Sequence, residues 1–107
     1  MSFYASGSGL IKARSESDCK IIEERNNDNS AFVIDGILVD NKIFVYHPFE
    51  NYAEECVHDF LRSINENTLY GEIVFEGEEN TNWRFKFKDG KWYEENGTIT
   101  YDEGYPV

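Results

Sequence analysis

The side chains of this chain that most often carry chemistry are two cysteines and two histidines: Cys19, Cys56, His47 and His58. A metal site needs several such ligands close together, and a cysteine or serine nucleophile needs a histidine beside it as a base. Cys56 and His58 lie two residues apart in a segment with helical periodicity, so they point to different sides of that helix. We therefore expect no metal, cofactor or catalytic residues, and interpret these four as buried thiols and surface or strand-end histidines.

Catalysis by a carboxyl group requires burial that raises its pKa. The acidic pairs of the chain are expected to be solvated, because their neighbours are polar: Glu54-Glu55, Glu78-Glu79 and Glu94-Glu95. Glu94 is the exception, because strand alternation places it on an aromatic face between Phe85 and Ile99. Two interpretations stay open. Either this strand pair reaches the sheet edge, where the carboxylate regains water, or Glu94 is a catalytic acid of a small enzyme.

Gly7-Ser8-Gly9 is a short glycine-containing segment that invites comparison with a phosphate-binding loop. Such loops contain more glycines and open a helix, whose N-terminal amides meet the phosphates. Here Leu10-Ile11-Lys12 continues as a strand. The pattern therefore predicts a bulge, a bend or the close approach of another backbone.

The composition is that of a small folded domain. The chain has 107 residues, of which 40% are apolar and 16% aromatic, so one hydrophobic core suffices and disorder is excluded. We expect a single domain over residues 1–107 with a sheet-rich core. No apolar run approaches the roughly 20 residues of a membrane span, and no signal peptide is recognisable. These features favour a cytoplasmic protein with free thiols and no membrane contact.

A strand and a short helix are expected first. Residues 3–14 have the composition of a strand. Ser15, with Asp18 three residues later, predicts the start of a helix, which the polar run 26–30 closes. The inward face of this helix carries Cys19, Ile21 and Ile22.

The next segment, residues 31–47, is rich in β-branched and aromatic side chains. Asp40-Asn41 predicts a hairpin turn within it. Asp35-Gly36 is either another tight turn or a bulge, and both interpretations stay open. Pro48 is expected to end the segment.

A second helix follows, for which Asn51 and Glu54 give a capping signal. Its inward face is predicted from helical spacing: Ala53, Cys56, Val57, Phe60, Leu61 and Ile64. Its outer face carries Glu54, Glu55, His58, Asp59 and Arg62. Residues 65–68 end the helix.

The C-terminal third has the pattern of a β-meander. Residues 69–76 form a strand, followed by an acidic loop at 77–80. Asp89-Gly90 and Asn96-Gly97 each predict a two-residue hairpin turn. The expected pairs are Phe87–Trp92, Trp92–Tyr101, Phe85–Glu94 and Glu94–Ile99. The core face then carries Trp83, Phe85, Phe87, Trp92, Ile99 and Tyr101, and the solvated face carries Arg84, Lys86, Lys88, Lys91, Tyr93, Glu95, Thr98 and Thr100.

The predicted order of elements is therefore β-α-ββ-α-βββ. Two helices on one face of an antiparallel sheet bury both layers economically. We expect the α+β class, with a two-layer ferredoxin-like sandwich extended by a C-terminal meander.

Charge is the strongest functional signal. Ten Lys and Arg stand against 21 Asp and Glu, a formal net charge of −11. Such a chain repels nucleic acid and is attracted to basic surfaces, including protein grooves that hold DNA or RNA. The carboxylates expected to form this partner-binding surface are Glu50, Glu54, Glu55, Asp59, Glu76, Glu78 and Glu79. Solubility alone is the other interpretation of the acidity.

A local basic stripe supports an alternative function. Arg84, Lys86, Lys88 and Lys91 lie within eight residues, and with Tyr93 they could form a small nucleic-acid-binding sheet. Cross-strand pairing with Glu95 also explains Arg84, and the other cations can be a solvated sheet face.

Residues 4–9 (Tyr-Ala-Ser-Gly-Ser-Gly) and residues 83–91 (Trp-Arg-Phe-Lys-Phe-Lys-Asp-Gly-Lys) are similar to stretches in small phage and bacterial domains. In size, acidity and α+β build the chain resembles the phage-encoded anti-CRISPR proteins. The resemblance implies a non-enzymatic inhibitor that acts in the cytoplasm of a host cell and blocks the nucleic-acid site of a CRISPR effector. These proteins share no common motif, so no site residue is transferred. A small enzyme subunit is the remaining alternative.

Overall fold

The computed structural model describes residues 3–97 and 105–107. Within these residues the α-helices and strands follow in the order β1 (Tyr4–Ala13), α1 (Glu16–Asn29), β2 (Val33–Leu38), β3 (Lys42–Asn51), α2 (Glu54–Ser63), β4 (Thr68–Gly77), β5 (Asn82–Lys88), β6 (Lys91–Gly97) and β7 (Tyr105–Pro106). Short 3-10 turns occupy Val39–Asn41, Asn65–Asn67 and Glu78–Asn80.

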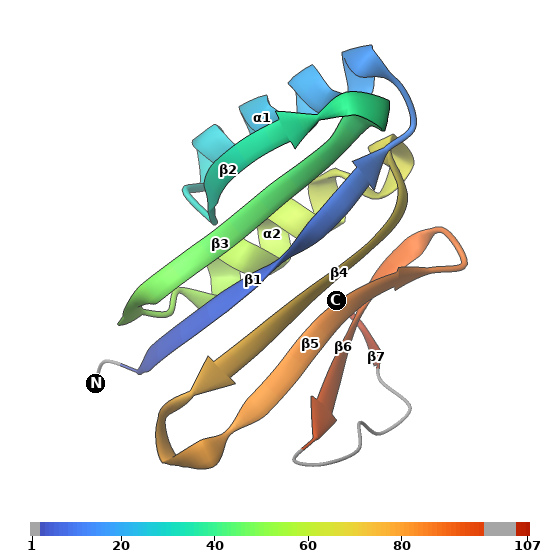
Figure 1. Cartoon of the computed structure of the whole chain (residues 1–107). Coiled ribbons are helices and arrows are strands. Elements are labelled where there is room, and N and C mark those ends of the chain that lie inside the picture. Colours follow the sequence, from blue (N-terminus) through green and yellow to red (C-terminus); the bar gives the residue numbers. More distant parts are fainter. Residues whose placement is uncertain (1–2, 98–104) are drawn as a thin grey trace.

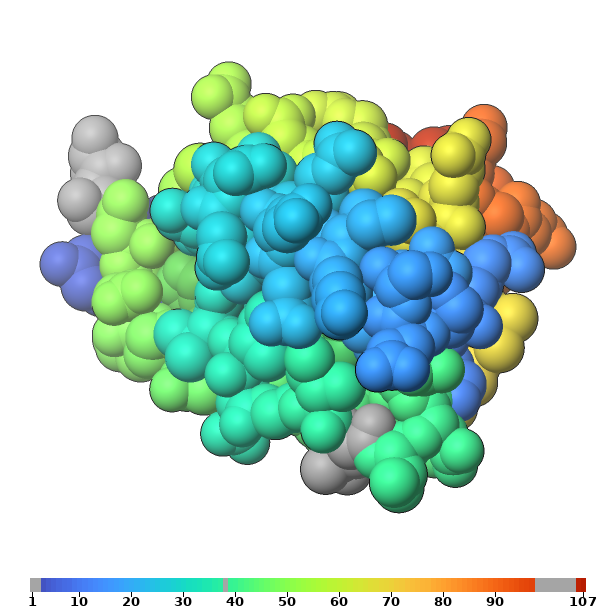
Figure 2. Space-filling model, turned by 90° about the horizontal axis from the view of Figure 1, so that it is seen from above, coloured from blue at the N-terminus to red at the C-terminus, as the bar shows by residue number. Residues whose placement is uncertain are grey.

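The strands form one sheet in the order β2-β3-β1-β4-β5-β6-β7, and each neighbouring pair is antiparallel. Both helices cover the same face of this sheet (Figure 1), and α1 lies between the β2–β3 hairpin and α2 (Figure 2). The α+β class and the two-layer arrangement are confirmed. The sheet is wider than that of a four-stranded sandwich, because β5, β6 and β7 continue it beyond β4.

β1 pairs with β3 on one side and with β4 on the other, and its glycines make this possible. A Cβ atom on Gly9 would overlap the carbonyl oxygen of Glu72 and lie 2.5 Å from the Cα of Ile73. The register between β1 and β3 also shifts between Ala5 and Gly7. The glycine segment therefore marks a close backbone approach next to a bulge, two of the three interpretations of the sequence.

α1 begins as predicted, since the Ser15 hydroxyl accepts a hydrogen bond from the Asp18 amide at 3.2 Å. The helix runs through most of the polar segment and ends at Asn29. Asn26 is buried within this segment. Its side chain donates to the Phe32 carbonyl and accepts from the Phe32 amide, both at 2.8 Å. This double hydrogen bond ties the end of α1 to the start of β2.

The β2–β3 hairpin is confirmed, with Asp40 and Asn41 at φ 68° and 60°. Asp35-Gly36 is a bulge, because the pairing of β2 with β3 shifts register between Ile34 and Gly36. Pro48 does not end β3, contrary to expectation. The strand bulges there, where the missing N–H of proline is tolerated.

β3 continues to Asn51 because its last residues still pair with the beginning of β1. Asn51 is therefore not the cap of α2, and the expected capping signal is wrong. Ala53 occupies the N-cap position without a side-chain hydrogen bond. The inward face of α2 is confirmed at Val57, Phe60 and Leu61, followed by the buried Ile64, while Ala53 is exposed and Cys56 half-buried.

The β5–β6 hairpin is confirmed, with positive φ at both Asp89 and Gly90. Phe85 pairs with Glu94 and Phe87 with Trp92 as predicted. The aromatic residues of this face are buried in the core: Trp83, Phe85, Phe87 and Trp92.

The expected turn at Asn96-Gly97 is wrong. β5 extends far enough to pair with both residues, so they belong to β6. On the other side of β6, Glu94 pairs with Tyr105 instead of the expected Ile99. The expected positions of Ile99, Tyr101, Thr98 and Thr100 lie outside the described residues.

Replacing Gly9 by alanine is expected to destabilise the fold by about 2 kcal/mol or more, because the obstructing atoms belong to the β4 backbone and cannot move aside as a side chain can. Gly36→Ala is the matched control, since a Cβ there meets nothing within 4 Å. Urea unfolding of both variants measures the difference. Equal stability of the two variants would contradict the close approach.

Candidate functional site

The acidic residues converge because of the strand register. Ala5 of β1 pairs with Glu50 of β3 and with Gly77 of β4, so the last residues of β3 and β4 flank the beginning of β1. α2 starts three residues after β3, at the same end of the molecule (Figure 1). We call this region the acidic end; its carboxylates are exposed and comprise Glu50, Glu54, Glu55, Glu76, Glu78 and Glu79.

No lysine or arginine interrupts the segments that build the acidic end, since residues 43–61 and 63–83 contain neither. Asp59, the seventh predicted residue, lies one turn further along α2 and forms an ion pair with Arg62. The structure thus brings six of the seven predicted carboxylates together and separates the seventh.

Two aromatic side chains are exposed at the acidic end. Phe49 is 63% exposed and Tyr4 is 41% exposed, and their ring centroids lie 5.8 Å apart. The sequence prediction missed this pair, because it assigned Tyr4 only to a strand and expected β3 to end before Phe49. Exposed aromatic residues among charged ones are typical of the anchor positions of protein interfaces.

Two of the four cations of the predicted basic stripe form ion pairs. Arg84 contacts Glu95 on β6, as predicted, and also Glu72 on β4 at 3.1 Å. Lys88 contacts Glu95 at 3.1 Å and lies 4.8 Å from the ring centre of Tyr93. The remaining two cations, Lys86 and Lys91, are exposed and have no ion pair within the described residues.

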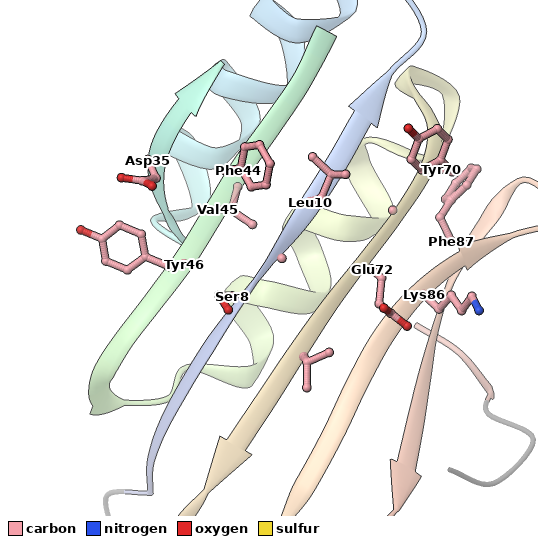
Figure 3. A pocket seen from close by; sticks show the side chains of 13 residues that line it. Ser8, Leu10, Asp35, Phe44, Val45, Tyr46, Tyr70, Glu72, Lys86 and Phe87 are labelled. Carbon is pink, nitrogen blue, oxygen red and sulfur yellow. The ribbon is translucent and has the colours of Figure 1, made fainter. Parts of the chain in front are cut away.

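The face of the sheet opposite the helices holds an open groove of about 600 Å³ (Figure 3). Its centre is apolar, with Leu10, Phe44 and Tyr70 on adjacent strands of the sheet. Charged side chains occupy its rim, namely Asp35, Glu72 and Lys86. Because two of these three groups are acidic, the groove offers a stacking surface with little attraction for phosphate.

Glu94 is buried, at 6% exposure, and this excludes a solvated position at the sheet edge. Its carboxylate lies 3.1 Å from Nε2 of His58, and the same nitrogen lies 3.8 Å from a carboxylate oxygen of Glu54. His58 is therefore half-buried between α2 and β6 instead of lying on the outer face of the helix. Its ring also meets Phe85 edge-on.

His47 belongs to the core. Its Nδ1 lies 3.0 Å from the carbonyl oxygen of Ala5, and since a carbonyl only accepts, Nδ1 carries the proton in this contact. The ring packs between Tyr52 and Phe75. Cys19 is buried as predicted, and burial raises the pKa of its thiol, which lowers its reactivity.

Comparison of the chain with protein-family models, with curated proteins and with solved structures finds no significant match. Neither described α-helix combines the length and the apolar character that a membrane crossing requires. Function therefore has to be argued from the geometry of the surfaces described above.

The Glu95 cluster gives a pH-dependent prediction. Burial raises the pKa of Glu95, but hydrogen bonds from Arg84 and Lys88 outweigh it and lower the pKa below its usual value. The carboxylate therefore stabilises the fold above the unfolded-state pKa, about 4.3, and this contribution is lost as pH falls through the folded-state pKa.

Glu95→Gln is accordingly expected to lower the free energy of unfolding by about 1–3 kcal/mol near neutral pH. The difference from wild type should shrink below about pH 4, as the wild-type carboxylate becomes protonated. Urea unfolding across a pH series measures this difference in the free energy of unfolding. Glu66→Gln, at an exposed position, is the control. A difference that stays constant with pH would contradict the role of the charge.

Proposed function

We propose that the protein is a non-enzymatic inhibitor that binds a basic surface of another protein through its acidic end. The observation that carries the proposal is the convergence of six exposed carboxylates from β3, α2 and the β4–β5 connection. Carboxylates on a rigid scaffold can take the place of phosphates in a groove lined with Arg and Lys. The proposed target class is a nucleic-acid-binding effector, such as a CRISPR nuclease.

The rigidity of the scaffold supports this proposal. The acidic end is held by main-chain pairing of β1 with both neighbours, and the β4–β5 connection is closed by hydrogen bonds between Gly77 and Thr81 and between Thr81 and Glu78. Carboxylates fixed in this way lose little conformational freedom on binding, which favours affinity.

In the same proposal we assign β1 to β4, together with the two helices, to the ferredoxin-like arrangement. The sheet order β2-β3-β1-β4 supports this assignment.

The alternative function, nucleic-acid binding by the basic stripe, has weaker support. Arg84 and Lys88 contact Glu72 and Glu95, so phosphate would have to compete with carboxylates already in place. Filter binding of single-stranded DNA or RNA at low salt distinguishes the two functions. Retention that is lost in a Lys86→Glu, Lys91→Glu double variant would favour the alternative.

Charge reversal tests the acidic end. Glu55→Lys combined with Glu78→Lys is expected to weaken binding to an effector nuclease by about tenfold or more, because like charges then meet across the interface. Wild-type binding should also weaken as salt is raised. The measurement is a pull-down against a panel of purified CRISPR nucleases, followed by a salt titration of any complex.

The matched control is Glu24→Lys combined with Glu66→Lys, which changes the net charge equally at exposed positions in α1 and in the turn before β4. If both double variants lose the same amount of binding affinity, the effect is one of net charge and not of the acidic end. Binding that persists in high salt or in the Glu55, Glu78 variant would refute phosphate mimicry.

Phe49→Ala tests the aromatic anchor. The side chain is 63% exposed, so its removal should leave the free energy of unfolding nearly unchanged, while binding weakens by roughly 1–2 kcal/mol or about tenfold. Val39→Ala, at the exposed β2–β3 turn, is the control. Loss of stability comparable to the loss of binding would show that Phe49 acts in folding instead.

A further inference from the structure

Three potential metal ligands meet between α2 and β6. Glu54 and His58 lie one helical turn apart on the same side of α2. Glu94, 36 residues further along the chain from His58, faces them from β6. One ligand atom from each of the three residues lies within 4.8 Å of those of the other two. The cluster thus combines one imidazole with two carboxylates from separate elements.

The two carboxylates converge on a single atom, Nε2 of His58, at 3.1 and 3.8 Å. Two ligand atoms that each lie about 2.1 Å from the same ion are about 3 Å apart when the ligand–metal–ligand angle is about 90°. They are at most about 4.2 Å apart, when that angle is about 180°. Both distances fall in this range. Because Glu54 is exposed, rotation of its side chain can bring the third pair of ligand atoms into the range as well.

Charge favours a divalent ion at this position. Burial of a carboxylate is costly unless its charge is compensated, and Glu94 is only 6% exposed. An ion of charge +2 would balance the charges of the two carboxylates, with the Nε2 lone pair of His58 directed at the metal. The ion would replace the hydrogen bond between His58 and Glu94.

Glu54 and Glu94 also border a pocket of about 340 Å³, which is lined by Phe3, Tyr52, Trp83 and Asn96 as well. Three protein ligands leave coordination positions open, and the pocket provides room for water or a small anionic ligand there. The buried indole Nε1 of Trp83 has no acceptor among the described residues, so it could donate to such a ligand.

From this geometry we propose that Glu54, His58 and Glu94 bind one divalent transition-metal ion whose open coordination positions face the pocket. The mixed nitrogen and oxygen ligand set suits Zn²⁺ or Mn²⁺ better than it suits Ca²⁺ or Mg²⁺, which take oxygen ligands. This proposal does not rest on the partner-binding role of the acidic end, although Glu54 belongs to both sites.

Isothermal titration calorimetry of the metal-free protein with Mn²⁺ and with Zn²⁺ tests the proposal. We expect saturation at one ion per chain and a rise in Tm when the ion is present. Glu54→Gln and His58→Gln should each weaken binding by at least about tenfold, since even loss of a group that only supports a ligand has an effect of that size.

Two matched controls isolate the site. Glu55→Gln removes the neighbouring exposed carboxylate on α2, and Cys56→Ser removes the nearest thiol in sequence; neither should alter binding. Glu54 is exposed, so its variant stays folded and keeps the test decisive even where His58→Gln reduces stability. Absence of saturable binding by the wild type, or binding that Glu54→Gln leaves unchanged, would overturn the proposal.

Discussion

The pairing of β1 with both β3 and β4 is the constraint on which the other features depend. It requires a strand whose helix-facing positions are small enough for the β4 backbone to come close, and Gly9 meets that requirement. Once β1 is in place, its register fixes where β3 and β4 end. Glu50 and Gly77 are brought to opposite sides of Ala5 by this pairing and not by any attraction between carboxylates, which repel one another.

The same register determines what α2 can reach. The helix leaves β3 at the acidic end and packs its apolar side on the sheet, with Val57, Phe60 and Leu61 buried. His58, adjacent to this apolar side, then meets β6. A narrower sheet that stopped at β4 would lack Glu94 and Phe85, the two residues beyond β4 that His58 contacts. The width of the sheet therefore creates the histidine–carboxylate cluster.

Local signals in the sequence predicted the elements well. The turn residues Asp40-Asn41 and Asp89-Gly90 adopt positive φ as such pairs favour, and Ser15 caps α1. Local signals failed where pairing with a distant strand prevailed. Asn96-Gly97 has the composition of a turn, but β5 supplies partners that keep both residues in β6. Contact of His58 with Glu94 depends on packing of a helix on a strand, and no local pattern encodes it.

Charge is segregated along the chain, because the segments that carry the carboxylates of the acidic end contain no lysine or arginine. At the opposite end of the sheet Lys12 pairs across the strands with Lys42, and its ammonium group donates to the main-chain carbonyl of Asp40. On α2, Arg62 forms an ion pair with Asp59. A net charge of −11 spread evenly would keep the protein soluble with less self-repulsion. Concentrating carboxylates at one end costs stability. In the proposed function a basic groove of the partner would compensate that cost, because it would meet a directed field instead of an average charge.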